Sequence, residues 1–438
     1  MTQDPSKPVW WRRVRLRFGL RGLMVVVLLV GGGLGWVVSR ARVQRDAVAA
    51  IVGAGGSVKY SWEWDSDRGT PPIKPAPPST PRWLLDALGP DLFHDVVAVH
   101  LTGPGAVVTE EVMAHVGRLS HLDALILRGC HTVKAPMLAH LRGLNRLRRL
   151  SLSDTGNLDG SFLPNLRGLK TLEYLDLYGP ISTDADLANL AGLVRVKSLR
   201  FRGPTVGDGG LAALTNLVEL ESLQVDSPLA TDAGVAQLRG LTRLRILSLT
   251  GRSVTDRGLA VLQGMPDLYH LELDRTGITR LGPLGPMPKL TDLRLIRSAI
   301  TDAGLAPLAS YPKLNVLLLN DTAIGDAGLA HVTASKSLTR LSLDGTQVTD
   351  TGLAQLAGSN IQILWLNRTG IGDAGLANLA GLSQLDMLTA ERTRVTDAGI
   401  ANLPGMAACT YFLIGGTAVT DAGIAEAQKK RPGMQFLR

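Results

Sequence analysis

Cysteine and aromatic residues are scarce in this sequence of 438 residues. The two cysteines, Cys130 and Cys409, lie far apart in the chain and are too few for a disulfide-stapled domain. Aromatic residues make up 4% of the chain, whereas apolar residues make up 45%. Such a chain fills its interior mainly with leucine, valine and alanine, which favours a repetitive architecture over two or three independent domains.

The sequence also lacks the common signatures of catalysis. It contains no G-x-S-x-G elbow, Walker A loop, H-E-x-x-H motif or kinase signature, and no nucleophile is paired with a base. Six of the eight histidines fall between residues 94 and 140, but no residue spacing supplies the third and fourth ligands of a zinc site. We therefore predict a protein that is not an enzyme, without catalytic residues, cofactor or metal ion.

Basic residues are concentrated at the N-terminus. The formal charge of the chain is +8, and residues 1–45 contain nine basic groups and one acidic group. Residues 46–438 contain 37 of each and are neutral overall. Because a nucleic-acid-binding protein carries its positive charge on the folded body, we predict no nucleic-acid partner.

An uncharged run, GLMVVVLLVGGGLGWVVS, occupies residues 22–39 between Arg21 and Arg40. As a helix it would span about 27 Å, close to the ~30 Å hydrocarbon core of a bilayer. We predict a transmembrane helix here that contacts membrane lipid. A buried core helix is less favoured because the run has no polar face, and a cleaved signal peptide because VVSRAR is a poor cleavage site.

The charges that flank this run predict its orientation. Basic residues are more numerous before it than after it, which favours residues 1–21 as a basic cytoplasmic tail. We expect a single-pass protein of the cytoplasmic (inner) membrane, with everything after residue 39 outside the cytoplasm. The following segments are predicted as a juxtamembrane helix and short strand (40–69), a Pro-rich linker (70–81), an N-terminal cap (82–94), repeats (95–421) and a C-terminal cap (422–438).

A unit of about 24 residues recurs fourteen times after the linker. Its pattern is L-x-x-L-x-L-x-x-T-x-[VI]-T-D-A-G-L-A-x-L-A-x-L. The L-x-L segment predicts a short strand with two leucines on one face, and GLAxLAxL predicts a short amphipathic helix. Strands separated by a helix should pair in parallel, so that stacked units share one leucine core.

This pattern resembles the leucine-rich repeat superfamily, specifically its 24-residue bacterial type with TDAGLA signatures. The resemblance implies an α/β fold, a leucine-rich repeat solenoid or horseshoe with a parallel concave β-sheet and convex helices, preceded by the predicted transmembrane helix. The N-terminal arrangement also resembles bacterial membrane-anchored repeat proteins. At the turn position that the family usually gives to asparagine or cysteine, this sequence mostly has threonine, such as Thr346, and in its first half often proline.

Ten aspartates recur at one phase of the repeat, each directly before the predicted helix. A calcium ladder is one interpretation, but calcium needs several more oxygen ligands at each turn. The favoured interpretation is that each carboxylate caps the free N–H groups of its helix.

The solvent-facing positions of the predicted strands are the candidate binding surface. In the early repeats they include basic residues, among them Arg149, Arg200 and Arg202. In the later repeats they are mostly apolar, and we predict that seven residues bind a partner: Val316, Leu318, Ile363, Trp365, Met387, Tyr411 and Leu413. The alternative is that such residues merely suit strands.

The sequence as a whole thus favours non-catalytic binding of an unknown protein or cell-envelope ligand on the concave face. Two other functions stay open. One is a cytoplasmic-facing adaptor that recruits substrates, although no recruiting motif is found. The other is a protein that promotes GTP hydrolysis through an arginine, although nothing in the sequence selects one.

Overall fold

The computed structural model describes residues 20–65, 70, 78–156, 158–180, 183–401, 403, 406 and 408–438. The side chains of residues 20–23, 26 and 180 are not described. Most of the predicted basic tail (1–19) and of the predicted linker (71–77) therefore lies outside the described residues, and the predicted domain boundaries stay predictions.

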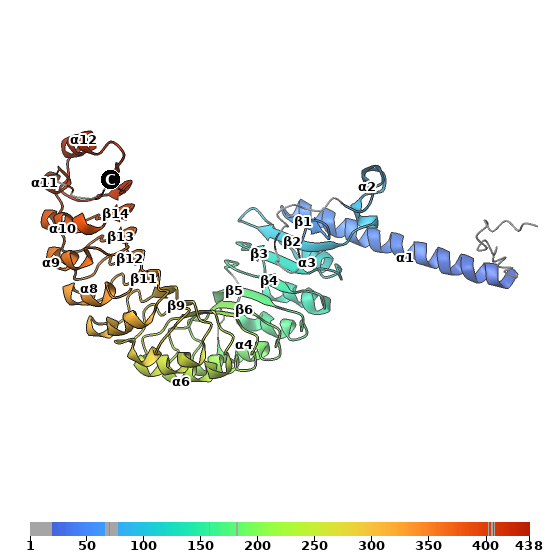
Figure 1. Ribbon diagram of the computed structural model, residues 1–438. Helices are drawn as coiled ribbons and strands as arrows, with labels where there is room; N and C mark the ends of the chain where they lie inside the picture. Colours follow the sequence, from blue (N-terminus) through green and yellow to red (C-terminus); the bar gives the residue numbers. More distant parts are fainter. Residues whose placement is uncertain are drawn as a thin grey trace, which may run out of the picture.

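The described chain forms a curved solenoid with its strands on the inner side of the curve and its helices on the outer side (Figure 1). One sheet of 16 strands runs in chain order from β1 to β16. β1 pairs with β2 antiparallel, and every later pair is parallel. The predicted solenoid with a parallel concave sheet is therefore confirmed.

The strands are short, and their register repeats the sequence period. Ser198 pairs with Ser222, and Ser222 pairs with Ile246, so the paired residues lie 24 positions apart. The strands are β1 (Ser57–Tyr60), β2 (Val96–Thr102), β3 (Ala124–Arg128), β4 (Arg149–Ser151), β5 (Tyr174–Pro180), β6 (Ser198–Arg202), β7 (Ser222–Asp226), β8 (Ile246–Leu249), β9 (His270–Glu272), β10 (Asp292–Arg294), β11 (Val316–Leu318), β12 (Arg340–Ser342), β13 (Ile363–Trp365), β14 (Met387–Thr389), β15 (Tyr411–Leu413) and β16 (Gln435–Leu437).

The convex side alternates between short α-helices and 3₁₀ helices. The α-helices are α1 (Leu20–Gly53), α2 (Arg82–Leu88), α3 (Glu110–Val116), α4 (Asp184–Leu187), α5 (Asp208–Ala212), α6 (Asp232–Gln237), α7 (Asp256–Leu259), α8 (Asp326–Val332), α9 (Asp350–Leu353), α10 (Asp373–Asn378), α11 (Asp397–Ala401) and α12 (Asp421–Lys430). The 3₁₀ helices are η1 (Pro90–Leu92), η2 (Ala135–Gly143), η3 (Gly160–Leu166), η4 (Ala188–Leu190), η5 (Leu238–Gly240), η6 (Ala260–Gly264), η7 (Gly282–Leu284), η8 (Ala303–Ser310), η9 (Ala354–Leu356) and η10 (Leu379–Gly381).

The leucines of the repeat form one continuous core along the solenoid. In the repeat around Thr346, Leu341, Leu343 and Leu353 are fully buried. Each buried leucine contributes about 2 kcal/mol of transfer free energy, although part of this is offset by lost conformational entropy. Since no unit can bury both of its apolar edges alone, the stack of units stabilises every member.

The second half of α1 closes the first end of this core. Ala41, Ala47 and Ile51 are buried at helical spacing, and α1 packs against α3 and β1. The side chain of Gln44 donates to Asp91 at 3.0 Å and accepts from the backbone N–H of Val96 at 3.0 Å. These bonds fix α1 to the first parallel strand, so the helix is an integral part of the solenoid from residue 41 onward.

The prediction of a transmembrane helix at residues 22–39 is not supported. These residues lie in the part of α1 that projects from the solenoid (Figure 1). Across the described part of the chain, however, no helix is sufficiently long and apolar to span a bilayer. Glycines occupy positions 31, 32, 33 and 35, and they add little apolar surface to the run.

At the other end, α12 and β16 close the last repeat. Met434 is buried, and the rings of Phe412 and Phe436 lie 6.0 Å apart. The guanidinium group of Arg431 donates to the carbonyl oxygen of Leu403 at 2.7 Å. A closing strand, β16, therefore follows the last helix.

Candidate binding face

The side chains at alternate strand positions point into the core or onto the concave face, as the burial patterns of the strands show. We divide this face into two regions. The polar half comprises β4 to β10, and the apolar half comprises β11 to β16.

In the apolar half, the structure brings the predicted binding residues onto adjacent strands. Ile363 pairs laterally with Met387, and Met387 pairs with Tyr411. Val316 and Leu318 lie on the same face of β11, but β12 separates them from β13, with Arg340 and Ser342 at the paired positions. The seven predicted residues are half-buried, except Tyr411, which is 39% exposed.

Trp365 lies at the centre of the apolar half. Its lateral neighbours are Ser342 on β12 and Thr389 on β14. These two residues occupy face positions and are nevertheless buried, at 3% and 2% exposure. Larger side chains stand on both sides of each small residue, so this part of the face is packed and continuous.

The hydroxyl group of Thr389 is buried and has no hydrogen-bond partner among the described residues. A buried hydroxyl without a partner costs on the order of 1–3 kcal/mol. This unpaired group lies beneath the surface next to Trp365, out of reach of a bound partner.

In the polar half, the basic residues noted in the sequence already have partners. Glu173 is buried and accepts hydrogen bonds from Arg148 at 2.9 Å and Lys197 at 3.0 Å. Burial acts to raise the pKa of Glu173, but the two cations outweigh it and the pKa is lowered. The guanidinium groups of Arg149 and Arg200 stack over tyrosine rings at 4.0 Å and 4.2 Å.

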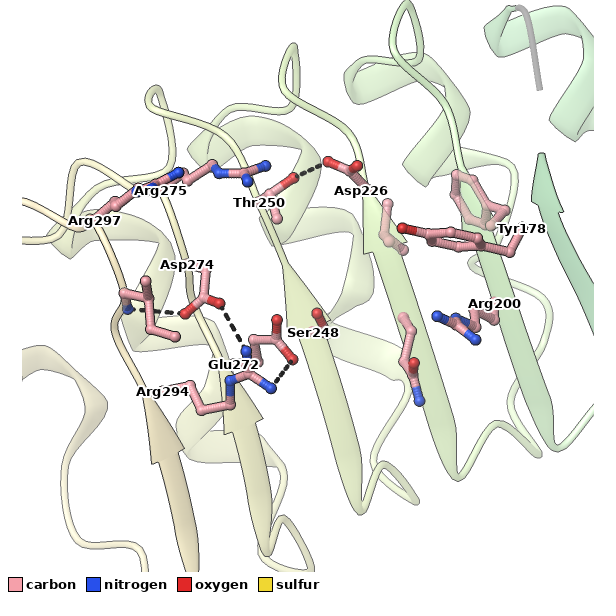
Figure 2. A pocket seen from close by; sticks show the side chains of 14 residues that line it. Tyr178, Arg200, Asp226, Ser248, Thr250, Glu272, Asp274, Arg275, Arg294 and Arg297 are labelled. Atoms are coloured by element: carbon pink, nitrogen blue, oxygen red, sulfur yellow. Dashed lines mark hydrogen bonds and ion pairs between the residues drawn. The ribbon is translucent and has the colours of Figure 1, made fainter. Parts of the chain in front are cut away.

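A hollow of about 450 Å³ lies in the polar half, and Figure 2 shows the side chains around it. Arg294 lies between two carboxylates, 3.6 Å from Glu272 and 3.3 Å from Asp274. Asp274 also accepts from the backbone N–H of Ile296 at 2.9 Å. Burial and the neighbouring Glu272 raise the pKa of Asp274 to about 6.

Sequence reasoning did not find this hollow. The signal was present, because the repeat LELDRTG places Glu272 and Asp274 at alternate positions and the next repeat places Arg294 beside them. A search that compares face positions across neighbouring repeats would have paired them.

The recurring aspartates have a different role from the one predicted. The carboxylate of Asp208 accepts from the backbone N–H and the hydroxyl of Thr231, at 2.8 Å and 2.6 Å. Thr231 precedes the helix of the next repeat. The same pair of bonds links Asp326 to Thr349. Nine of the ten carboxylates tie their repeat to the following one through a backbone N–H, whereas Asp421, in the last repeat, pairs with Arg438.

The turn threonines form hydrogen bonds within their own repeat. The hydroxyl of Thr346 donates to the carbonyl oxygen of Leu343 at 2.6 Å, and Thr276 makes the same bond to Leu273. In the first half, Cys130 instead lies 3.0 Å from the carbonyl oxygen of Leu101 in the preceding repeat.

Among the residues that the structure describes, no group of three or more His, Cys, Asp or Glu side chains is placed to hold a metal ion. Of the clustered histidines, His140 lies 2.6 Å from Glu110 and forms a pair with it.

Comparisons with known proteins agree on the architecture. No family model and no curated protein sequence matches the chain. Among solved structures, it is similar to the ectodomain of the Arabidopsis receptor kinase HAESA in complex with a peptide hormone ligand, with a TM-score of 0.50, 15% identity, and coverage of 92% of this chain and 69% of that chain.

Two further solved structures are similar. The ectodomain of the Arabidopsis thaliana receptor kinase GASSHO1/SCHENGEN3 has a TM-score of 0.50 and 14% identity, over 79% of this chain and 50% of that chain. An internalin from Listeria monocytogenes has a TM-score of 0.49 and 21% identity, over 78% of this chain and 89% of that chain. These similarities show that the chain has the leucine-rich repeat fold, which agrees with its repeating sequence unit.

Proposed function

We propose that this protein is a non-catalytic binding module that holds a protein or cell-envelope partner on the apolar half of its concave face. The observation that carries the proposal is the lateral contact of Ile363, Met387 and Tyr411, with Trp365 beside them. Tryptophan and tyrosine are the side chains that most often dominate binding free energy, because they bury a large area with few rotatable bonds.

The half-burial of these residues supports the proposal. Side chains that are already ordered by their neighbours lose little conformational entropy when a partner covers them. The similar structures of HAESA and GASSHO1/SCHENGEN3 are complexes with a peptide hormone and with CASPARIAN STRIP INTEGRITY FACTOR 2, respectively, which is compatible with this proposal.

Chemical crosslinking followed by mass spectrometry tests the proposal. Wild type, Trp365→Ala and Trp83→Ala are compared, where Trp83 is a matched control because it is 70% exposed on α2, away from the concave face. We expect the yield of one crosslinked partner to fall at least tenfold with Trp365→Ala and to stay unchanged with Trp83→Ala. An unchanged yield with Trp365→Ala, at an unchanged melting temperature, would contradict the proposal.

We also propose that the protein is anchored in the cytoplasmic membrane with the repeats outside the cytoplasm. Support comes from the uncharged run at 22–39 and from the exposure of its apolar side chains, such as Leu28 at 71% and Leu29 at 70%. Exposure of apolar side chains to water to this extent is unfavourable, and insertion into a bilayer would remove them from water.

Two measurements test this location. Leu28→Asp/Leu29→Asp should move the protein from the membrane fraction to the soluble fraction, whereas Trp83→Asp should not. A topology reporter fused after Arg438 should be active outside the cytoplasm. Reporter activity in the cytoplasm alone would favour the cytoplasmic-facing adaptor instead.

A further inference from the structure

Three exposed arginines stand at the rim of the concave face, where strands β6, β8 and β9 run into their turns. We call Arg202, Arg252 and Arg275 the rim arginines. They line a hollow of about 340 Å³ together with Asp226 and Thr250. Arg275, Asp226 and Thr250 also line the larger hollow in Figure 2, so the two hollows adjoin.

The fold does not require arginine at position 252. The equivalent residues Thr276 and Ser298 donate their hydroxyl groups to the carbonyl oxygen three residues earlier, at 2.7 Å in both cases. Arg252 replaces this bond with an exposed guanidinium group that forms no ion pair within the described part of the chain. Arginine at this position therefore lacks the structural hydrogen bond of threonine or serine and adds a positive charge that no described carboxylate pairs with.

The fold does not require arginine at position 275 either. The backbone of Arg275 is in the left-handed region, with φ of 57°. Arg297, Arg368 and Arg392 share this conformation at the same position of later repeats, whereas Gly345 and Gly416 occupy it in two others and avoid the strain that a side chain adds. Arg275 is exposed, and none of the described residues forms an ion pair with it.

Charge in the rim hollow is unbalanced. Asp226 is its one carboxylate, and it already accepts from Thr250 at 2.9 Å and lies 3.2 Å from Arg202. Arg252 and Arg275 therefore leave about two positive charges with no carboxylate to neutralise them. Two guanidinium groups at one hollow favour an anion with planar oxygen pairs.

We propose that the rim arginines bind the carboxylate side chains of an acidic peptide segment. This inference rests on the proposed function, because the segment belongs to the partner on the concave face. Glu272 and Asp274 line the adjoining hollow and would repel a polymer with charge on every unit, such as a nucleic acid. Gln224 and Ser248 line the same hollow and offer uncharged hydrogen bonds to a peptide backbone.

Fluorescence anisotropy with the full chain and a fluorescein-labelled ten-residue peptide that carries two adjacent glutamates among serines (the glutamate peptide) tests the inference. The variant Arg252→Thr/Arg275→Gly restores the residues that other repeats use and should fold at least as stably as wild type. Arg239→Gln is the matched control, since Arg239 is an exposed arginine on η5. At low salt we expect the double variant to bind about tenfold more weakly and the control to bind within twofold of wild type.

The outcomes separate this inference from the proposed function. Equal binding by wild type and the double variant, or no binding by wild type at millimolar peptide, overturns the inference, whereas the crosslinking of Trp365→Ala is independent of it. Tighter binding of a ten-nucleotide single strand than of the glutamate peptide, lost in the same double variant, also overturns it in favour of a nucleic acid.

Discussion

The polar and apolar halves of the concave face share one backbone and differ in almost every exposed side chain. In both halves the strands pair in the same parallel register, and the leucines behind them are buried alike. In front of the sheet, the polar half is covered by ion pairs and arginine–tyrosine stacks, and the apolar half by Ile363, Trp365, Met387 and Tyr411. The backbone of the solenoid therefore tolerates both polar and apolar side chains on its concave face, so these side chains can differ without changing the fold.

The two halves also differ in how they would hold a partner. A polar contact must compete with pairs that already exist, such as Arg294 with Glu272 and Asp274. Its strength falls with added salt. An apolar contact gains from water release and is almost independent of salt. A partner that spans both halves would thus obtain its affinity mainly from the later repeats and part of its specificity from the earlier ones.

The largest expected effect is on stability in the polar half. Glu173→Ala leaves Arg148 and Lys197 without their shared, buried carboxylate and should lower the free energy of unfolding by about 3 kcal/mol. In the apolar half, Thr339→Ala removes only a neutral bond from Asn315 and should cost about 1 kcal/mol. Urea denaturation followed by circular dichroism measures both.

Glu221 is the matched control, because it occupies the equivalent position directly before its strand and lies 3.7 Å from Arg245, but is 45% exposed. Glu221→Ala should change stability by less than about 0.5 kcal/mol. If Glu173→Ala and Glu221→Ala cost the same, burial of the ion pair is not what stabilises the polar half.

Substitution of a glycine on the convex side should lower stability by an intermediate amount, and by the same amount in both halves. Gly234→Ala and Gly352→Ala would each push a Cβ into the carboxylate of the preceding repeat's aspartate, Asp208 or Asp326. Both should therefore destabilise the chain by about 2 kcal/mol. Gly240→Ala is the control, since nothing lies near its Cβ position. A large difference between the first two variants would show that the convex side also differs between the halves.

The smallest expected effect depends on pH. Because burial raises the pKa of Asp274 to about 6, the folded chain binds the proton more tightly than the unfolded chain, whose aspartate has a pKa near 3.8. Stability from this group is therefore greatest below about pH 4 and is lost as the pH rises to about 6. Partial exposure reduces the expected loss to about 1 kcal/mol.

Asp274→Asn should abolish this dependence. Asparagine already occupies the equivalent position in later repeats, at Asn320 and Asn367, so the fold accommodates it. Thermal melts of both proteins between pH 4 and pH 7 measure the difference. If the melting temperatures of wild type and Asp274→Asn changed in parallel with pH, Asp274 would titrate at its ordinary pKa.

Much of the architecture was predictable because the repeat is local and periodic. The positions of Leu341 and Leu343 predict a strand, and the 24-residue spacing predicts its parallel neighbour. The turn threonines were predictable for the same reason, since each bond joins residues three apart. The seven apolar face residues follow from alternation along a strand, and the structure places them on one face.

Contacts between repeats were harder to predict. The phase of the aspartates indicates a helix start, but only the stacked structure shows that Asp208 reaches forward to Thr231. The hydropathy of residues 22–39 likewise describes one segment in isolation, and it does not show what the helix contacts further along the chain. In the structure the same helix continues into the solenoid, where Ile51 is buried against the first repeat.

The sequence by itself determined the repeat, the leucine core and the alternation of the face, because these depend on spacing along one chain. Tertiary structure alone decided which side chains of different repeats meet: Arg294 with Asp274, Trp365 with Thr389, and the rim arginines around one hollow. The physical reason is that lateral contacts depend on strand register and on the left-handed turns. A small change in register from repeat to repeat changes every lateral pair, yet it leaves the pattern within each repeat unchanged.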